Sequence, residues 1–254
     1  FSSEVLAKTH TTTASQKSHL TKASNKQVSS KQEYSRNSAK SSSLPDLRKY
    51  PSGTPRKKAF LRTVMPYITS QNAAITAERN WLISKQYQGQ WSPAERARLK
   101  DIAKRYKVKW SGNTRKIPWN TLLERVDIIP TSMVATMAAA ESGWGTSKLA
   151  RNNNNLFGMK CMKGRCTNAP GKVKGYSQFS SVKESVSAYV TNLNTHPAYS
   201  SFRKSRAQLR KADQEVTATA MIHKLKGYST KGKSYNNYLF AMYQDNQRLI
   251  AAHM

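Results

Sequence analysis

The chain has 254 residues, a formal net charge of +30 and a mean hydropathy of −0.72. No apolar run approaches the ~20 residues of a membrane-spanning helix, so we expect a chain that does not span a membrane. The positive charge suits any polyanion. However, Lys and Arg are spread along the chain, and no helix-turn-helix, zinc-finger or RNA-binding signature is found, so we expect no specific nucleic-acid partner.

The first 57 residues are too polar to join a packed core. They contain 11 Lys and Arg and 3 Asp and Glu among runs of Ser and Thr. Such a segment has too little apolar surface to offset the entropy of ordering, which predicts a disordered basic tether over residues 1–57. Within it, Val5-Leu6-Ala7 resembles the small-residue end of a signal peptide, so we expect an exported protein whose mature chain begins at Lys8.

Apolar spacing predicts helices through most of the remaining chain. A long amphipathic helix is expected over residues 59–88, and Ser92 followed by Pro93 predicts the start of a second helix. With a short helix at 118–126, residues 58–127 would form a helical subdomain packed on a catalytic domain at 128–254. Further helices are expected near residues 182–194, 205–211, 216–226 and 235–250, whereas residues 152–179, rich in Gly, Asn and Lys, should form loops and a short hairpin.

Glu141 is the one acidic residue between positions 130 and 183. It falls in the last turn of a helix that Thr131 can cap and that Gly143 can end in a left-handed conformation. The negative end of the helix dipole and partial burial both favour the protonated carboxyl, which can then protonate a glycosidic oxygen. The alternative is that Glu141 pairs with a nearby cation such as Lys148 and only stabilises the helix end.

Cys161 and Cys166 are the two cysteines of the chain and are separated by four residues. Two thiols without a nearby His would leave a tetrahedral zinc site half empty, so we favour a disulfide over zinc. A disulfide suits an oxidising compartment such as the periplasm. His196 and His223 have no partner at metal-ligand spacing, and we expect neither a metal nor a cofactor.

Two long motifs resemble those of glycoside hydrolase family 73. The first runs from Ala140 to Ala150 as A-E-S-G-W-G-T-S-K-L-A, and the second is N-L-F-G-M-K at 155–160. They resemble the patterns A-x-E-S-x-W-G-x-S-x-L-A and N-L-F-G-x-K of flagellar and autolytic β-N-acetylglucosaminidases. Weaker matches at 176–185 and 228–235 extend the likeness to about half of the chain. With its tether and helical segment, the whole chain resembles the enterobacterial Bax-type members of this family.

The resemblance implies a mainly helical (α+β), lysozyme-like fold in which a cleft separates a helical lobe from a small loop or hairpin lobe. The chain would be a monomeric, exported glycosidase that binds peptidoglycan glycan strands and cleaves the β-1,4 bond after N-acetylglucosamine. Glu141 would be the general acid. A family tyrosine that supports the reaction is best matched by Tyr228, with Tyr235 as the second choice.

Sugar-binding residues are expected around the same motifs, because flat aromatic rings stack on the C–H faces of pyranose rings. The expected substrate-binding residues are Trp144, Asn155, Phe157, Gly158, Tyr235 and Tyr238. The alternative is that an aromatic ring of this set packs in the core and that Asn155 closes a turn.

Many family members have a second acidic residue in the hairpin lobe, but residues 142–183 contain neither Asp nor Glu. Glu184 comes next, yet its motif position begins a helix, where we expect it to cap or pair. We therefore prefer a substrate-assisted route in which Tyr228 hydrogen-bonds the attacking N-acetyl group; water held by polar groups is the alternative. Two other functions compete: a lytic transglycosylase, whose E-S-x-F and G-L-M-Q signatures are not seen, and a catalytically weak wall-binding module.

Overall fold

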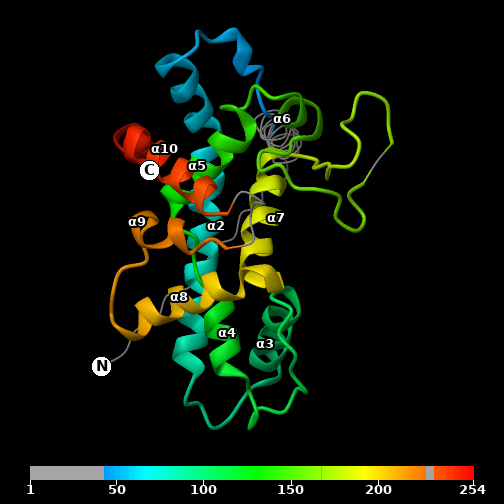
Figure 1. Ribbon diagram of the computed structural model, residues 1–254. Coiled ribbons are helices and arrows are strands. Elements are labelled where there is room, and N and C mark those ends of the chain that lie inside the picture. The colour runs from blue at the N-terminus through cyan, green and yellow to red at the C-terminus, as the bar shows by residue number, and fades with distance from the viewer. Residues whose placement is uncertain (1–42, 167, 227–231) are drawn as a thin grey trace, which may run out of the picture. The chain divides into compact units, whose positions relative to one another are not determined.

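The computed structural model describes residues 43–166, 168–226 and 232–254, which are mainly helical as predicted (Figure 1). The helices are α2 (Thr54–Lys85), α3 (Pro93–Arg105), α4 (Trp119–Arg125), α5 (Thr131–Ser142), α6 (Lys148–Asn153), α7 (Val182–Thr195), α8 (Ser200–Lys211), α9 (Ala218–Met221) and α10 (Lys233–Ala251), with the 3-10 helices η1 (Leu47–Lys49), η2 (Pro197–Tyr199) and η3 (Ile222–Lys224). Within these ranges, none of the helices combines the length and apolar composition of a membrane span. The expected tether up to residue 42, with its export signal, lies outside the described residues.

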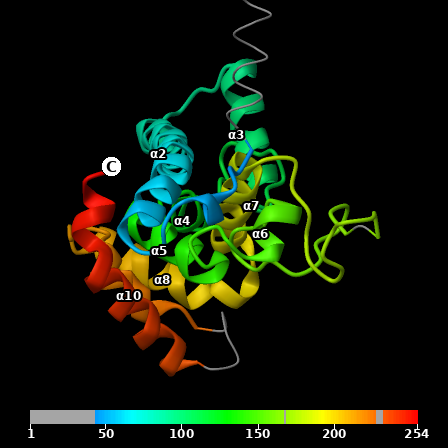
Figure 2. The same ribbon diagram turned by 90° about the horizontal axis from the view of Figure 1, so that it is seen from above.

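The central helix of the core is α5, which packs between α2 and α10 (Figures 1 and 2). Seven consecutive residues of α5, from Met133 to Ala139, are buried. Several of them are alanines, whose small side chains allow neighbouring helices to approach on more than one side. Helix α2 also packs along α7, so the expected subdomain 58–127 shares a core with the expected catalytic domain 128–254.

The ordered structure begins earlier than the tether boundary predicted at residue 57. The side chain of Asp46 caps η1, Leu47 is fully buried, and α2 already starts at Thr54. Pro55 in the first turn of α2 favours this start because its fixed φ suits a helix. The composition of the segment is polar, but Leu47, with Leu44 beside it, packs on the core, and Arg56 donates hydrogen bonds to the carbonyls of Leu47 and Tyr50. Residues 43–57 are therefore part of the folded body, which corrects the predicted boundary.

A buried ionic cluster joins α2, α8 and the segment that leads into α5. The carboxyl of Asp127 is 2% exposed and accepts hydrogen bonds of 2.9 and 2.7 Å from Arg210. It also forms ion pairs with Arg79 at 3.6 Å and with the fully buried Arg206 at 3.9 Å. Desolvation raises the pKa of Asp127, but the hydrogen bonds from Arg210 and the nearby guanidinium charges outweigh it and lower the pKa. No local pattern in the sequence predicts this cluster.

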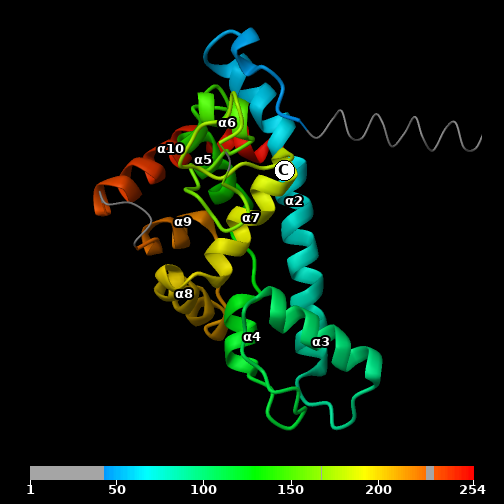
Figure 3. The same ribbon diagram turned by 90° about the vertical axis from the view of Figure 1, so that its right-hand side faces the viewer.

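The chain between α6 and α7 forms the predicted loop lobe, which extends away from the helices (Figure 2). Its expected hairpin is reduced, in the described residues, to one isolated antiparallel bridge between Lys160 and Tyr176. The predicted disulfide between Cys161 and Cys166 is present. Helices α3 and α4 lie elsewhere, beside the C-terminal end of α2 (Figure 3).

Candidate active site

Glu141 lies in the last turn of α5, where the sequence predicts it. Gly143 ends the helix with φ 56° and ψ 50°, the left-handed conformation expected for it. The buried hydroxyl of Ser142 donates to the carbonyl of Ala138 at 2.6 Å and accepts from the N–H of Gly145 at 2.8 Å. These two hydrogen bonds fix the backbone directly after the carboxyl.

Leu47, from the N-terminal segment, packs against Gly145 in the turn that follows Glu141. Its φ is +80°, and a Cβ atom added to it would lie 2.5 Å from Leu47 Cδ1 and 3.2 Å from Phe60 Cδ2. A side chain at this position would therefore displace Leu47 or Phe60. Glycine is therefore required at position 145 because Leu47, which lies far outside the motif, packs closely against it.

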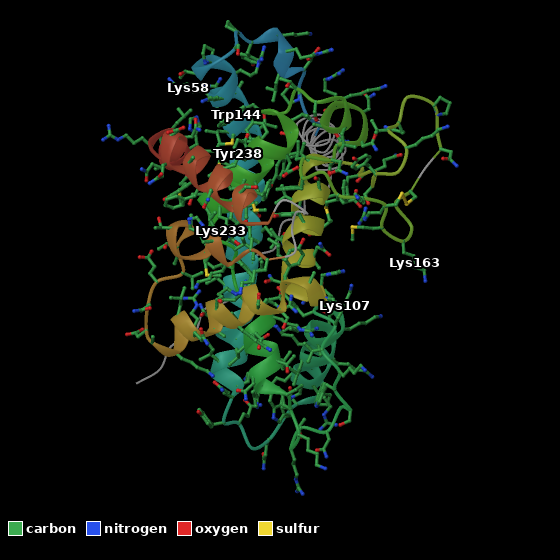
Figure 4. All side chains as sticks on the ribbon, viewed as in Figure 1. Lys58, Lys107, Trp144, Lys163, Lys233 and Tyr238 are labelled. Carbon is green, nitrogen blue, oxygen red and sulfur yellow. A yellow bond between two sulfur atoms is a disulfide. The ribbon has the colours of Figure 1, made fainter. Side chains whose placement is uncertain are left out.

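A pocket of about 460 Å³ adjoins Glu141. Its other lining residues are Ala140, Ser234, Tyr235 and Tyr238, most of them from α10. The hydroxyl of Tyr235 donates a hydrogen bond to Glu141 Oε1. Tyr238 is 55% exposed and leaves its ring accessible on α10 (Figure 4). The structure therefore brings the predicted acid together with two of the predicted tyrosines.

The surroundings of Glu141 favour its protonated form. Burial raises the pKa of the carboxyl, and the hydrogen bond from Tyr235 lowers it by a smaller amount, so the net shift is upward. No Lys or Arg in the described part of the chain forms an ion pair with Glu141, and the alternative pairing with Lys148 is not observed. Glu141 consequently keeps its proton to a higher pH than an ordinary glutamic acid.

Gly158 lies against the other oxygen of this carboxyl. With φ +66°, it is placed so that an added Cβ atom would be 3.2 Å from Glu141 Oε2. The turn that carries Gly158 is closed by Asn155, whose side-chain oxygen accepts from the N–H groups of Phe157 and Met159. Asn155 is 1% exposed, so its predicted contact with substrate is replaced by the alternative role of closing the turn.

Two aromatic residues predicted to bind sugar face other parts of the protein. Phe157 is 3% exposed and stacks on Tyr189 with ring centroids 4.0 Å apart, so the prediction that it offers a face to a sugar is wrong. Trp144 packs edge-on against Phe60 of α2, and Lys57 Nζ lies 5.0 Å from its ring centre. Trp144 therefore contacts α2 and does not line the pocket.

Tyr228, predicted to assist catalysis, lies outside the described residues. Tyr235, the second choice for that role, contacts the acid directly. Ala140 and Ser234 were not predicted, although each is the chain neighbour of a predicted residue, Glu141 or Tyr235. Sequence adjacency was the one signal that could have found them.

Glu184 is engaged at the start of α7, as expected from its motif position. Its Oε2 accepts hydrogen bonds of 2.6 Å from both the N–H and the hydroxyl of Ser180, and its Oε1 accepts one from Arg165. Desolvation raises the pKa of Glu184, but these hydrogen bonds outweigh it and lower the pKa to about 2. Glu184 is therefore an ionised, paired group that does not line the pocket.

A half-buried acid with a raised pKa in a tyrosine-lined pocket can serve as the general acid of a glycoside hydrolase. A family model described as mannosyl-glycoprotein endo-β-N-acetylglucosaminidase matches residues 118–248, half of the chain, including Glu141 and Tyr235. The protein thus belongs to the glucosaminidase family, glycoside hydrolase family 73, and is an endo-β-N-acetylglucosaminidase with the lysozyme-like, mainly helical fold. No solved structure matches the chain. The finer resemblance to the Bax-type members stays a prediction.

Proposed function

We propose that this enzyme cleaves the β-1,4 bond after N-acetylglucosamine in bacterial peptidoglycan, with Glu141 as the general acid. The observation that supports this role is a carboxyl with a raised pKa, hydrogen-bonded by Tyr235, in the wall of a pocket of about 460 Å³. A positioned acid of this kind accelerates the departure of a sugar oxygen by about 10²- to 10⁴-fold. The family assignment supports the substrate linkage.

The two oxygens of Glu141 would have different tasks. Oε1 accepts the hydrogen bond from Tyr235, so the transferable proton belongs on Oε2. Gly158 leaves Oε2 uncovered, because a side chain at that position would lie against it. After the proton has moved to the leaving oxygen, the Tyr235 hydroxyl would stabilise the carboxylate that remains.

The second catalytic group would be the substrate itself. No second carboxyl lines the pocket among the residues that the structure describes, and Glu184 is held by Ser180 and Arg165. We propose that the N-acetyl oxygen attacks the anomeric carbon while Glu141 protonates the departing oxygen. Glu141 would then take a proton from the water that opens the resulting ring. Tyr228 would hydrogen-bond the N-acetyl group.

We propose that the enzyme is exported and works in the periplasm of a Gram-negative bacterium as a monomer. A cell-wall substrate and the Cys161–Cys166 disulfide both support a location outside the cytoplasm. The resemblance of Val5-Leu6-Ala7 to a signal-peptide end supports export in the same way.

Digestion of purified peptidoglycan tests the proposal. The wild type should release chains with reducing-end N-acetylglucosamine, Glu141→Gln should release them about 10³-fold more slowly, and the exposed Glu215→Gln should behave as the wild type. Mass spectrometry of the products separates the alternatives. Anhydromuramyl ends would identify a lytic transglycosylase, and a protein that pellets with the wall without releasing sugar would be a binding module.

A further inference from the structure

The loop lobe beside Glu141, defined here as residues 158–181, carries positive charge alone. It contains five Lys and Arg and no Asp or Glu. The five are Lys160, Lys163, Arg165, Lys172 and Lys174. Such a concentration of one sign creates a local field that attracts anions.

Three of these cations have no internal role. Arg165 pairs with Glu184, and Lys172 Nζ donates to the carbonyl of Asn152 at 2.7 Å. The remaining lysines, at positions 160, 163 and 174, are exposed, and no described residue accepts a hydrogen bond or an ion pair from them. Their charges are therefore available to a partner.

The lobe links these lysines to the catalytic acid. It begins at Gly158 against the Glu141 carboxyl, and Lys160 follows two residues later in the bridge to Tyr176. The Cys161–Cys166 disulfide closes the turn that carries Lys163, which Figure 4 shows on the outward-reaching part of the lobe. When a glycan strand binds with its scissile bond at Glu141, the loop lobe with its lysines therefore lies beside that strand.

We propose that Lys160, Lys163 and Lys174 bind the carboxylates of the stem peptides next to the cleaved bond. This inference rests on the proposed function, because peptidoglycan carries acidic peptides on alternate sugars of its glycan strand. The lobe would then select stem-bearing strands and hold them against the acid. Exposed ion pairs are individually weak and salt-screened, so three together should change binding by only about fivefold.

Binding in a non-hydrolysing background provides the test. Full-length protein with Glu141→Gln is sedimented with purified peptidoglycan, and with the same wall after its carboxylates have been converted to amides with carbodiimide and ammonia. Adding Lys160→Gln, Lys163→Gln and Lys174→Gln should raise the Kd for intact wall about fivefold. Amidation should weaken the Glu141→Gln parent by a similar factor and leave the lobe variant unchanged within about twofold.

The matched control removes the same charge elsewhere, through Lys100→Gln, Lys104→Gln and Lys109→Gln. These lysines are exposed and lie on α3 or just after it. Helix α3 lies beside the C-terminal end of α2, whereas α6 lies near the other end of α2 (Figure 3). The control should change the Kd by less than about twofold.

Equal losses in the lobe and control variants would overturn the proposal, as would an amidation effect that persists in the lobe variant. A lobe variant that loses duplex DNA binding, with no response to wall amidation, would point to a general polyanion surface and also overturn it. Sugar release is measured separately, so a wild type that binds through the lobe without cleaving the wall would contradict the proposed function alone.

Discussion

Two carboxyls, the buried Asp127 and the half-buried Glu141, lie toward opposite ends of α5 and have opposite surroundings. Asp127, ahead of the helix, contacts Arg79, Arg206 and Arg210, whereas Glu141, in the last turn, has no ion pair within the described residues. Burial raises the pKa of both groups. Three arginines reverse that effect at Asp127, but a single tyrosine only partly offsets it at Glu141. The presence or absence of nearby cations, more than burial, therefore decides whether the pKa of the carboxyl is lowered, as at Asp127, or raised, as at Glu141.

The largest expected effect on activity is that of Glu141→Gln, which should leave stability almost unchanged. Glu141→Gln should lower kcat about 10³-fold, because glutamine has no proton to transfer to the leaving oxygen. Thermal unfolding should stay close to that of the wild type, since the amide oxygen still accepts from Tyr235. Sugar-release kinetics and calorimetry measure the two quantities. A variant that keeps a tenth of the wild-type activity would remove Glu141 from its assigned role.

The opposite pattern is expected at the other end of α5. Asp127→Asn leaves the fully buried Arg206, the half-buried Arg79 and the exposed Arg210 without their shared counterion, which should cost about 3–5 kcal/mol of unfolding free energy at pH 7. The folded pKa of Asp127 is lowered, so its stabilisation is complete above its unfolded pKa and is lost as pH falls through the folded value. The difference between variant and wild type in urea unfolding should therefore shrink in acid.

Asp101→Asn is the matched control for this prediction, because it removes a carboxylate that is 62% exposed and paired with Arg105 on α3. Its cost should be below about 1 kcal/mol. Similar losses at Asp101 and Asp127 would mean that the buried cluster contributes no more than a surface pair.

A smaller change should appear when Tyr235 loses its hydroxyl. The hydrogen bond from Tyr235 lowers the pKa of Glu141, so Tyr235→Phe should raise that pKa and move the alkaline limb of kcat/KM to higher pH. We expect kcat to fall about tenfold, because the carboxylate left after proton transfer loses a charge-assisted hydrogen bond. Tyr238→Phe should leave the alkaline limb in place. An unchanged or acid-shifted limb in Tyr235→Phe would contradict the proposed coupling.

The smallest effect on activity is expected at Glu184. Glu184→Gln should keep activity within about tenfold of the wild type, because the residue does not line the pocket. The pKa of Glu184 is lowered from 4.5 to about 2, so its stabilisation is present above pH 4.5 and is lost between pH 4.5 and about 2. Unfolding midpoints across this range measure it. An inactive Glu184→Gln enzyme would argue against the substrate-assisted route.

The sequence predicted the parts of the molecule that local rules control. Helix periodicity located most helices, and Ser92 caps α3 as predicted. Helix α5 carries Glu141 in its last turn as expected, but Thr131 is its first residue and does not cap it, because the N-cap position is Pro130 and no side chain caps this helix. The spacing of Cys161 and Cys166 predicted the disulfide. In each case the signal depends on neighbours within a few residues, which are readable without a tertiary structure.

The missed features depend on contacts between distant segments. Phe157 and Tyr235 both belong to family motifs, but Phe157 stacks in the core whereas Tyr235 hydrogen-bonds Glu141. Nothing in the motifs predicts this difference. Asp127 and its arginines lie on three separate elements, so no local pattern reveals them. The polar neighbours of Leu47 predict a tether, whereas its burial depends on contacts with the distant Phe60 and Gly145.

The close packing of Leu47 against Gly145 indicates how much of the chain an active fragment needs. The matched family segment starts at residue 118, but α2, which precedes it, covers apolar sides of α5 and α7. A fragment trimmed to 118–248 would expose those sides to water and leave the backbone after Glu141 without its support. The smallest piece expected to behave as an independent hydrolase is therefore the compact unit from Ser43 to Met254, which is much longer than the segment that defines its family.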